Sequence, residues 1–420
     1  MSTTLQPLTD SLQQMQHPPR RRGIVLVFWI LVFAAMPVWI AFDSPGWDLA
    51  IYHTAIRALA AGHDPYADAI AIQQLFHSQL ALHPNAQVPY SYVYSPITLP
   101  FLRLIGEFPI WLSGSVYWLV YLAGILAQIW VAMQATTDTE RRYFIYLAPV
   151  AAFFPGFLAN GTVLSGNVAY ILYALVLLAA VRGWRRGSWH WFYLATLAAS
   201  CVKAPLLSLV VIPILSARRQ WLPAGITTAG GVALFAIQPL IWPTLFKHYL
   251  QAVELQFRYN RDFGCSPSGL FSGVLYDRGI PYSPASFIFY LCYAIPLFAL
   301  LLYLSRRFLS GGFSLKQWIP VLLVGVILLN PRLIEYDVAP LALPLALIAW
   351  RFLSSFTTPA RTILVLSIFF AVANAFALYS WDLRKLIDGP LLVLFFLTGS
   401  WNLLQGSRRF TAASKLGATI

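Results

Sequence analysis

The sequence predicts an all-α integral membrane protein, a polytopic bundle of about 11–13 transmembrane helices. Of its 420 residues, 59% are hydrophobic and 10% are charged, and the mean hydropathy is +0.67. A soluble domain of this composition could not cover its core with polar surface. Apolar runs of about 18 or more residues also recur along the whole chain. Any chemistry is therefore expected to come from the helices and their loops.

The chain is strongly basic, with a formal net charge of +13. Its arginines form short clusters separated by apolar spans, as in the cytoplasmic loops of membrane proteins. This pattern indicates contact with membrane lipids and disfavours nucleic acid as a partner. The clusters lie at residues 20–22, 185–186, 218–219, 306–307 and 408–409.

The same clusters orient the chain in a cell membrane. Residues 1–22 are predicted to form a cytoplasmic tail, residues 23–405 the transmembrane region, and residues 406–420 a second cytoplasmic tail. A first span at about residues 24–42 would be a retained signal anchor, because no small-residue cleavage site precedes Asp43. The apolar stretch 96–106 is too short to cross fully and predicts a re-entrant or tilted half-helix. Further spans are expected near 110–134, 143–156, 163–181, 189–201, 203–217, 221–241, 286–305, 317–330, 337–353, 362–380 and 390–405.

This topology places a second set of loops on the periplasmic or extracellular side. Loops 43–94, 241–286 and 330–337 carry acidic and aromatic residues, and we expect them to form a site. The first of them is predicted to be partly helical. Residues 381–389 are expected to form another external loop.

Asp48 is a scarce carboxylate placed just after the first apolar span. Ser44 and Pro45 are favourable residues for a helix start, and Asp48, Tyr52 and Ala55 would then share one helical face. Asp48 could be a first-turn acidic residue that interacts with the helix dipole. It could equally be a base that faces a lipid-borne substrate.

Several short motifs follow one another along residues 43–345. They are Asp48, Tyr52, Arg57, Gly62, Pro65 and Tyr66, then Tyr94-Ser95-Pro96, Ser165-Gly166-Asn167, Lys203-Ala204-Pro205 and Asn330-Pro331-Arg332. In this order they resemble glycosyltransferase family eighty-seven, the polyprenyl-phosphate-mannose-dependent mannosyltransferases of the GT-C superfamily, with residues 47–66 similar to the family's first external loop. After the last motif this chain has Glu335-Tyr336-Asp337 where the family tends to have histidine.

The resemblance implies a GT-C-like bundle that transfers a sugar, expected to be mannose, from a polyprenyl-phosphate donor with inversion. The acceptor would be a hydroxyl of a glycolipid, a polysaccharide or a protein. No cofactor is expected, because the lipid-linked sugar is itself the substrate. The family is not characterised by a metal, so we assign none, although Asp64 and Asp68 could support a divalent ion with Asp48.

Such a transfer needs a base for the acceptor hydroxyl and cations for the departing phosphate. Asp48 is the candidate catalytic base. The candidate cations are Lys203, Arg258, Arg261 and Arg332, for which snorkelling or local ion pairing is the alternative interpretation. Other candidate substrate contacts are Tyr52, His53, Arg57, Tyr94, Asn167, Glu335, Tyr336 and Asp337.

A transporter or flippase of lipid-linked sugars is the alternative function. A path across the membrane would need polar residues deep within several spans, whereas the charges of this chain gather in the loops. We also find no internal repeat, which many secondary transporters contain.

Overall fold

The computed structural model describes residues 46–80, 91–144, 162–260, 263–280, 284–379 and 381–417. Within these ranges the chain is α-helical with short 3₁₀ segments and contains no strand. The all-α prediction is therefore confirmed. The expected first span at 24–42, the N-terminal tail and most of the expected span at 143–156 lie outside the described residues.

Among the described residues, five helical segments are long and apolar enough to cross a membrane. Helices α10 (Ala169–Arg186), α11 (His190–Val202) and α18 (Leu315–Leu328) are further apolar elements of the bundle. The predicted total of 11–13 spans stays a prediction. The five segments are α6 (Ile110–Gln134), Trp221–Ile241 with α13 (Trp221–Ala236), α17 (Pro284–Leu309), Glu335–Ser354 with α20 (Ala342–Ser354), and Ile387–Gln405 within α22 (Trp381–Gly417).

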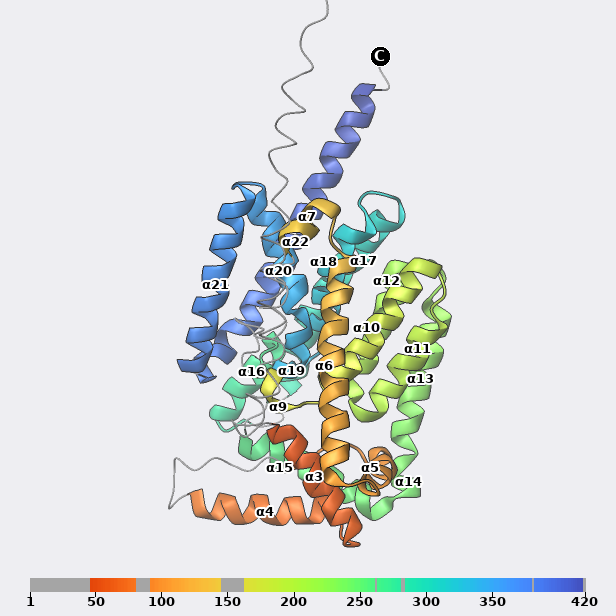
Figure 1. The fold of residues 1–420 in the computed structure, drawn as a ribbon, viewed down its shortest axis with the longest axis vertical. Coiled ribbons are helices and arrows are strands. Elements are labelled where there is room, and N and C mark those ends of the chain that lie inside the picture. The colour runs from red at the N-terminus through yellow and green to blue at the C-terminus, as the bar shows by residue number, and fades with distance from the viewer. Residues whose placement is uncertain are drawn as a thin grey trace, which may run out of the picture. The chain divides into compact units, whose positions relative to one another are not determined.

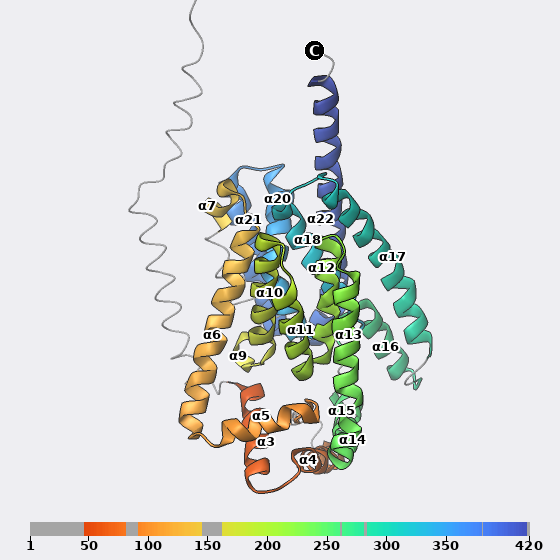
Figure 2. The same ribbon diagram turned by 90° about the vertical axis from the view of Figure 1, so that its right-hand side faces the viewer.

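The long helices from residue 110 onward run roughly alongside one another in two groups (Figures 1 and 2). In the first group, α10 (Ala169–Arg186) packs between α6 and α11 (His190–Val202), and α11 packs against α13. In the second, α18 (Leu315–Leu328) packs against α20 and α22. Most residues of α18 and α20 are buried, so these helices form the core of the second group. Helix α12 (Val211–Ser216) contacts both α13 and α18 and joins the groups.

Helices from distant parts of the sequence cover one end of the bundle (Figures 1 and 2). Here α3 packs on α4 and α5, and α4 packs on α15. Their buried side chains form one apolar cluster that includes Tyr52, Tyr66, Tyr92 and Leu255. The predicted partly helical first loop is confirmed by the first two of these helices. The four are α3 (Trp47–Ala60), α4 (Pro65–Leu80), α5 (Leu99–Gly106) and α15 (Pro243–Asn260).

The face predicted for α3 is also present. Asp48, Tyr52 and Ala55 are all buried, at the helical spacing expected from the sequence. The helix begins at Trp47 after Gly46, whose φ is +74°. The expected cap at residues 44 and 45 lies outside the described residues.

One boundary prediction was wrong. Residues 381–389, predicted to be an external loop, form the start of α22. Charged residues in a segment do not by themselves end a helix. The predicted separation of 189–201 from 203–217 is present, because the chain is extended at Lys203 and continues as the apolar segment η2 (Ala204–Val210) and α12.

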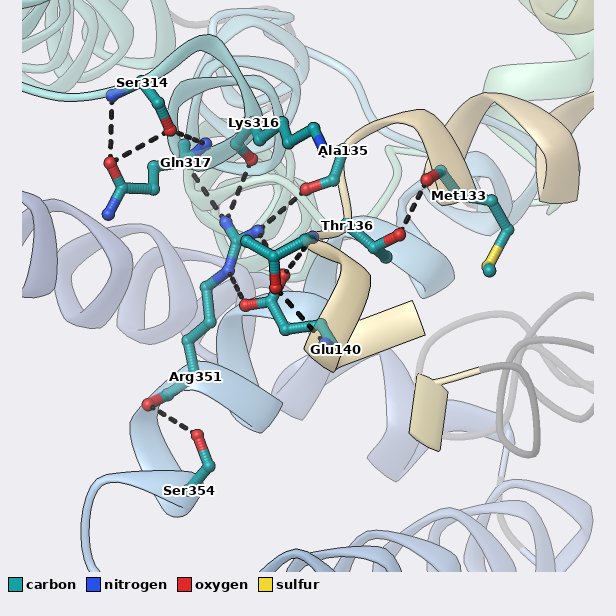
Figure 3. Close-up of polar contacts among 10 residues, drawn as sticks. Met133, Ala135, Thr136, Glu140, Ser314, Lys316, Gln317, Arg351 and Ser354 are labelled. Atoms are coloured by element: carbon teal, nitrogen blue, oxygen red, sulfur yellow. Dashed lines mark hydrogen bonds and ion pairs between the residues drawn. The ribbon is translucent and has the colours of Figure 1, made fainter. Parts of the chain in front are cut away.

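An ion pair joins the other ends of several helices (Figure 3). Arg351 of α20 donates from Nε to Glu140 Oε1 at 2.8 Å and from Nη2 to Glu140 Oε2 at 3.1 Å. The same guanidinium donates to the carbonyls of Ala135 and Lys316, at 2.8 and 3.1 Å. One side chain thereby ties together the end of α6, helix α7 (Asp138–Phe144), the start of α18 and α20.

Candidate active site

A cavity of about 250 Å³ lies at the start of α3. The segments that precede η1 (Pro96–Thr98), α10 and η2 and the turn before α19 (Glu335–Val338) complete its wall. Its wall combines ionisable side chains with apolar ones such as Val202, Phe235 and Val253. Eight of the candidate site residues from the sequence line this cavity, and they come from five separate segments. They are Asp48, Tyr94, Asn167, Lys203, Arg332, Glu335, Tyr336 and Asp337.

Asp48 is 8% exposed, and its Oδ2 atom is buried without a hydrogen-bond partner among the described residues. Burial raises the pKa of this carboxyl above its ordinary value. Hydrogen bonds from Tyr336, Asn167 and Ser165 and the charge of Lys203 act in the opposite direction. A buried carboxylate with one unengaged oxygen at a cavity wall is suited to accept a proton from a bound ligand.

Asn167 is held in a fixed orientation beside Asp48. Gly166, with φ +68°, breaks the chain between α9 (Thr162–Ser165) and α10. Beyond this break, the backbone N–H of Ala169 donates to Asn167 Oδ1 at 2.9 Å. The amide oxygen is thereby engaged, so the Nδ2 group is the donor that faces the cavity. This group lies 3.5 Å from the Tyr94 hydroxyl.

Tyr52 and Tyr94 connect the cavity wall to the cluster beneath it. Their hydroxyl oxygens are 2.8 Å apart, and the Tyr52 hydroxyl accepts from the backbone N–H of Val168 at 3.2 Å. The Tyr66 hydroxyl donates to the Tyr94 carbonyl at 2.5 Å. Tyr94 lines the cavity, whereas Tyr52 lies behind it and holds α3 against the start of α10.

Lys203 and Asp337 form the main ion pair of the site. Their side chains are 11% and 3% exposed, and Lys203 Nζ lies 2.9 Å from Asp337 Oδ1. The same oxygen accepts from the Tyr173 hydroxyl at 3.3 Å, and Oδ2 accepts from the Ile334 backbone N–H at 3.3 Å. Lys203 therefore faces the protein interior instead of snorkelling to a surface. Asp337 thus pairs with a cation from outside the 332–337 turn.

The turn that carries Arg332 is anchored by residues 264–268 of the predicted loop 241–286, none of which was named as a candidate site residue. Ser266 and Ser268 donate from their hydroxyls to the Pro331 carbonyl, at 2.5 and 2.6 Å, and Cys265 donates from its N–H to the Leu333 carbonyl at 2.6 Å. A β-carbon at Gly264, whose φ is +80°, would lie 2.2 Å from that carbonyl oxygen. Close approach of the two backbones thus requires glycine here.

Two other predicted contacts, His53 and Arg57, do not line the cavity, and two lie outside what the structure describes. Arg57 is exposed, and His53 is half-buried near Gly114 of α6. Arg258 lies in the last turn of α15, but its side chain is outside the described residues, and Arg261 is outside them altogether.

Asp64, which could support a divalent ion according to the sequence, instead makes contacts within the protein. Asp64 Oδ1 accepts from the Tyr66 N–H at 2.8 Å at the start of α4, and Oδ2 lies 2.6 Å from His248 Nδ1. Asp68 lies 3.9 Å from His63. These contacts tie α4 to its neighbours, and over the described ranges no group of three metal-ligating side chains occurs.

Sequence reasoning missed several residues of the cavity wall. Ser91, Tyr249 and Gln256 line it, and Gln256 Oε1 accepts from Gln73 Nε2 at 3.2 Å. A buried glutamine on an otherwise amphipathic helix, α15, was the signal that could have identified one of them. No family model, curated protein or solved structure matches this chain.

Proposed function

We propose that this protein is an integral-membrane glycosyltransferase that moves a sugar, expected to be mannose, from a polyprenyl phosphate to an acceptor hydroxyl. The observation that carries the proposal is the Asp48 carboxylate, which lines a cavity together with Lys203 and Arg332 and whose buried Oδ2 atom has no hydrogen-bond partner among the described residues. The motif resemblance described above supports the same assignment. The active site would lie on the periplasmic or extracellular side of the cell membrane.

The site offers a base and cations in one enclosed volume. In the proposed reaction the acceptor oxygen attacks the anomeric carbon while the bond from that carbon to the phosphate oxygen breaks. Asp48 Oδ2 takes the acceptor's proton, and the departing phosphate keeps the bonding electron pair. Lys203 has three N–H donors, of which Asp337 accepts one, so others are available for the phosphate. Arg332 is the second candidate for this charge.

The apolar part of the wall fits the lipid portion of such a donor. Val202, Phe235 and Val253 line the cavity, and the neighbouring α13 exposes large apolar side chains such as Ile226 and Val232. A polyprenyl chain could therefore extend from the cavity along apolar surface. No nucleotide-binding glycine-rich loop is needed for a donor of this kind.

The test is a transfer assay with purified protein, a radiolabelled polyprenyl-phosphate mannose and a panel of glycolipid acceptors. We expect a labelled product with a new glycosidic bond, and we expect Asp48→Asn to reduce its formation by at least about 10³-fold. Asp68→Asn is the matched control, because Asp68 is also a first-turn carboxylate but lies on α4. Movement of the labelled lipid between leaflets without a new glycosidic bond would instead indicate a flippase.

A further inference from the structure

One side of the cavity is lined by uncharged residues. Tyr249, Val253 and Gln256 line it from α15, at the spacing that places them on one face of the helix. Ser91 lines it from the segment before η1. We call these residues the neutral wall. The charged residues that line the cavity come from other segments, and they are Asp48, Lys203, Arg332, Glu335 and Asp337.

Gln256 has an amide group that the protein uses only in part. Gln256 is 8% exposed, and its Oε1 accepts from Gln73 Nε2 of α4 at 3.2 Å. Over the described residues, Gln73 is its one hydrogen-bond partner. Gln73 is fully buried and does not line the cavity. Because Oε1 is turned toward Gln73, the Nε2 group and its two N–H donors are left for the cavity.

The contact with Gln73 also restricts the Gln256 side chain. With its carbonyl held from α4, Gln256 presents a donor that is already oriented, and this lowers the entropic cost of binding a ligand. A buried donor that is left unused is costly, so the arrangement favours a ligand oxygen that accepts from Nε2.

Ser91 and Tyr249 add two other surfaces to the neutral wall. The Ser91 hydroxyl contacts the Ala69 carbonyl at 3.4 Å, which is longer than a normal O–H···O hydrogen bond. This hydroxyl can therefore exchange its partner for a ligand. The Tyr249 ring is held by Tyr66 and Phe235, whose ring centroids are 5.9 and 6.4 Å away, and it supplies an aromatic surface.

We propose that the neutral wall binds the sugar of the lipid-linked donor, and that Gln256 recognises one of the sugar hydroxyl groups. A hydroxyl is uncharged and both donates and accepts, so it suits an amide and a serine hydroxyl. The apolar carbons of a sugar ring can pack on Tyr249. The phosphate suits the charged side of the cavity, with Lys203 and Arg332.

The position of the neutral wall favours the sugar of the donor over a sugar of the acceptor. Phe235, which belongs to the apolar lining assigned to the lipid portion, packs against Tyr249. The neutral wall therefore adjoins the lipid side of the cavity. This inference rests on the proposed function, because it assigns the selectivity of the same site.

The first test measures binding without turnover. Purified full-length protein in detergent is titrated, in the absence of acceptor, with polyprenyl-phosphate mannose and with polyprenyl phosphate that carries no sugar. We expect Gln256→Met to weaken binding of the first lipid by about tenfold and to leave binding of the second unchanged, because one hydrogen bond to the sugar is lost. The readout is the ratio of the two dissociation constants, in which a common effect on lipid binding cancels.

Gln128→Met is the matched control for a loss of packing. Gln128 of α6 is also buried, at 6% exposed, and donates from Nε2 to the Tyr170 carbonyl at 2.9 Å, but it does not line the cavity. If Gln256 only joined α4 to α15, both variants would lose thermal stability and neither would change the ratio. We expect the ratio to change in Gln256→Met and to stay at the wild-type value in Gln128→Met.

Gln256→Glu separates the ligand contact from the contact between helices. An ionised glutamate keeps an oxygen that can accept from Gln73, but it has no N–H donor. We expect this variant to change the ratio of dissociation constants in the same direction as Gln256→Met. It also tests the inference if Gln256→Met does not fold.

Donors that each lack one sugar hydroxyl identify the group that Gln256 contacts. In the wild type, the donor without that hydroxyl should bind about tenfold more weakly than the complete donor. In Gln256→Met the two donors should bind equally, because both changes remove the same hydrogen bond.

An unchanged ratio in both Gln256 variants would overturn the inference and leave the proposed function in place. Additive losses for every deoxy donor would have the same meaning. A loss confined to the KM of a glycolipid acceptor would also contradict the inference, since Gln256 would then bind the acceptor. If the wild-type protein binds neither lipid, the proposed function itself fails, and the inference fails with it.

Discussion

Lys203 and Asp337 are separated by 134 residues in the sequence, yet their side chains form a 2.9 Å ion pair that is almost completely buried. Lys203 lies where the chain is extended between α11 and η2, and Asp337 lies in the short helix α19 (Glu335–Val338). Both residues line the cavity that contains Asp48. The position of a cation in the site thus depends on one contact between two distant segments.

We expect Asp337→Asn and Lys203→Met each to destabilise the protein by about 3 kcal/mol, because each leaves a buried charge without its partner. The double variant should recover part of this loss, as measured by thermal unfolding in detergent. Lys203→Met should also raise the KM for the lipid donor at least about tenfold. The double variant should not recover donor binding, since the cation is still absent. Recovery of both properties would exclude Lys203 as a phosphate ligand.

Asp48 should make stability decrease as pH rises. Burial raises its pKa above 3.8 in the folded protein, so between the two pKa values the folded state binds more protons than the unfolded state. Stability therefore falls as pH increases through this window. Asp48→Asn removes the cost of burying the charge, and its Tm at neutral pH should exceed that of the wild type by about 1–3 °C. A lower Tm at neutral pH would contradict this expectation.

Gly264 and Gly279 provide a matched pair for testing the turn that carries Arg332. Their φ angles are +80° and +75°, but an added β-carbon would meet the Leu333 carbonyl at Gly264 and open space at Gly279. Gly279→Ala should cost only the backbone strain, about 1 kcal/mol. Gly264→Ala should cost at least about 2 kcal/mol more and lower transfer activity, because the turn must move. If chemical denaturation gives the two variants the same loss of unfolding free energy, the close approach of Gly264 to the Leu333 carbonyl does not stabilise the turn.

The Arg351–Glu140 pair should stabilise the opposite end of the bundle. Burial alone would raise the pKa of Glu140, but the Arg351 hydrogen bonds and charge outweigh it and hold this pKa below 4.5. Since Arg351→Met leaves Glu140 without its cation, we expect a loss of about 2 kcal/mol at neutral pH. The contribution of the pair is present above pH 4.5 and is lost as pH falls through the folded-state pKa. Thermal unfolding of the variant and the wild type should therefore converge in acid, whereas a constant difference would contradict this origin.

Local features of the sequence predicted part of this structure. Helical spacing identified the buried face of α3, with Asp48, Tyr52 and Ala55, because periodicity is a property of a single segment. The apolar runs on either side of Lys203 also predicted the break there, between the expected spans 189–201 and 203–217.

Contacts between distant segments were beyond such reasoning. Trp47 and Tyr336 are 289 positions apart, and no local signal in the sequence indicates that their side chains meet. The anchoring of the Pro331 carbonyl by Ser266 and Ser268 was missed for the same reason. The motif resemblance nominated eight residues that line one cavity, but it also nominated Arg57, which is exposed.

A structure of Asp48→Asn with a bound polyprenyl-phosphate mannose tests the central claim most directly. The variant keeps the shape of the side chain but cannot take the acceptor's proton, so the donor should remain intact. We predict that the phosphate lies within about 3 Å of Lys203 Nζ or the Arg332 guanidinium. The anomeric carbon should face residue 48, with room for an acceptor hydroxyl between them. A donor bound outside this cavity, or with its phosphate against residue 48 and its sugar turned away, would contradict the proposed site and the role of Asp48.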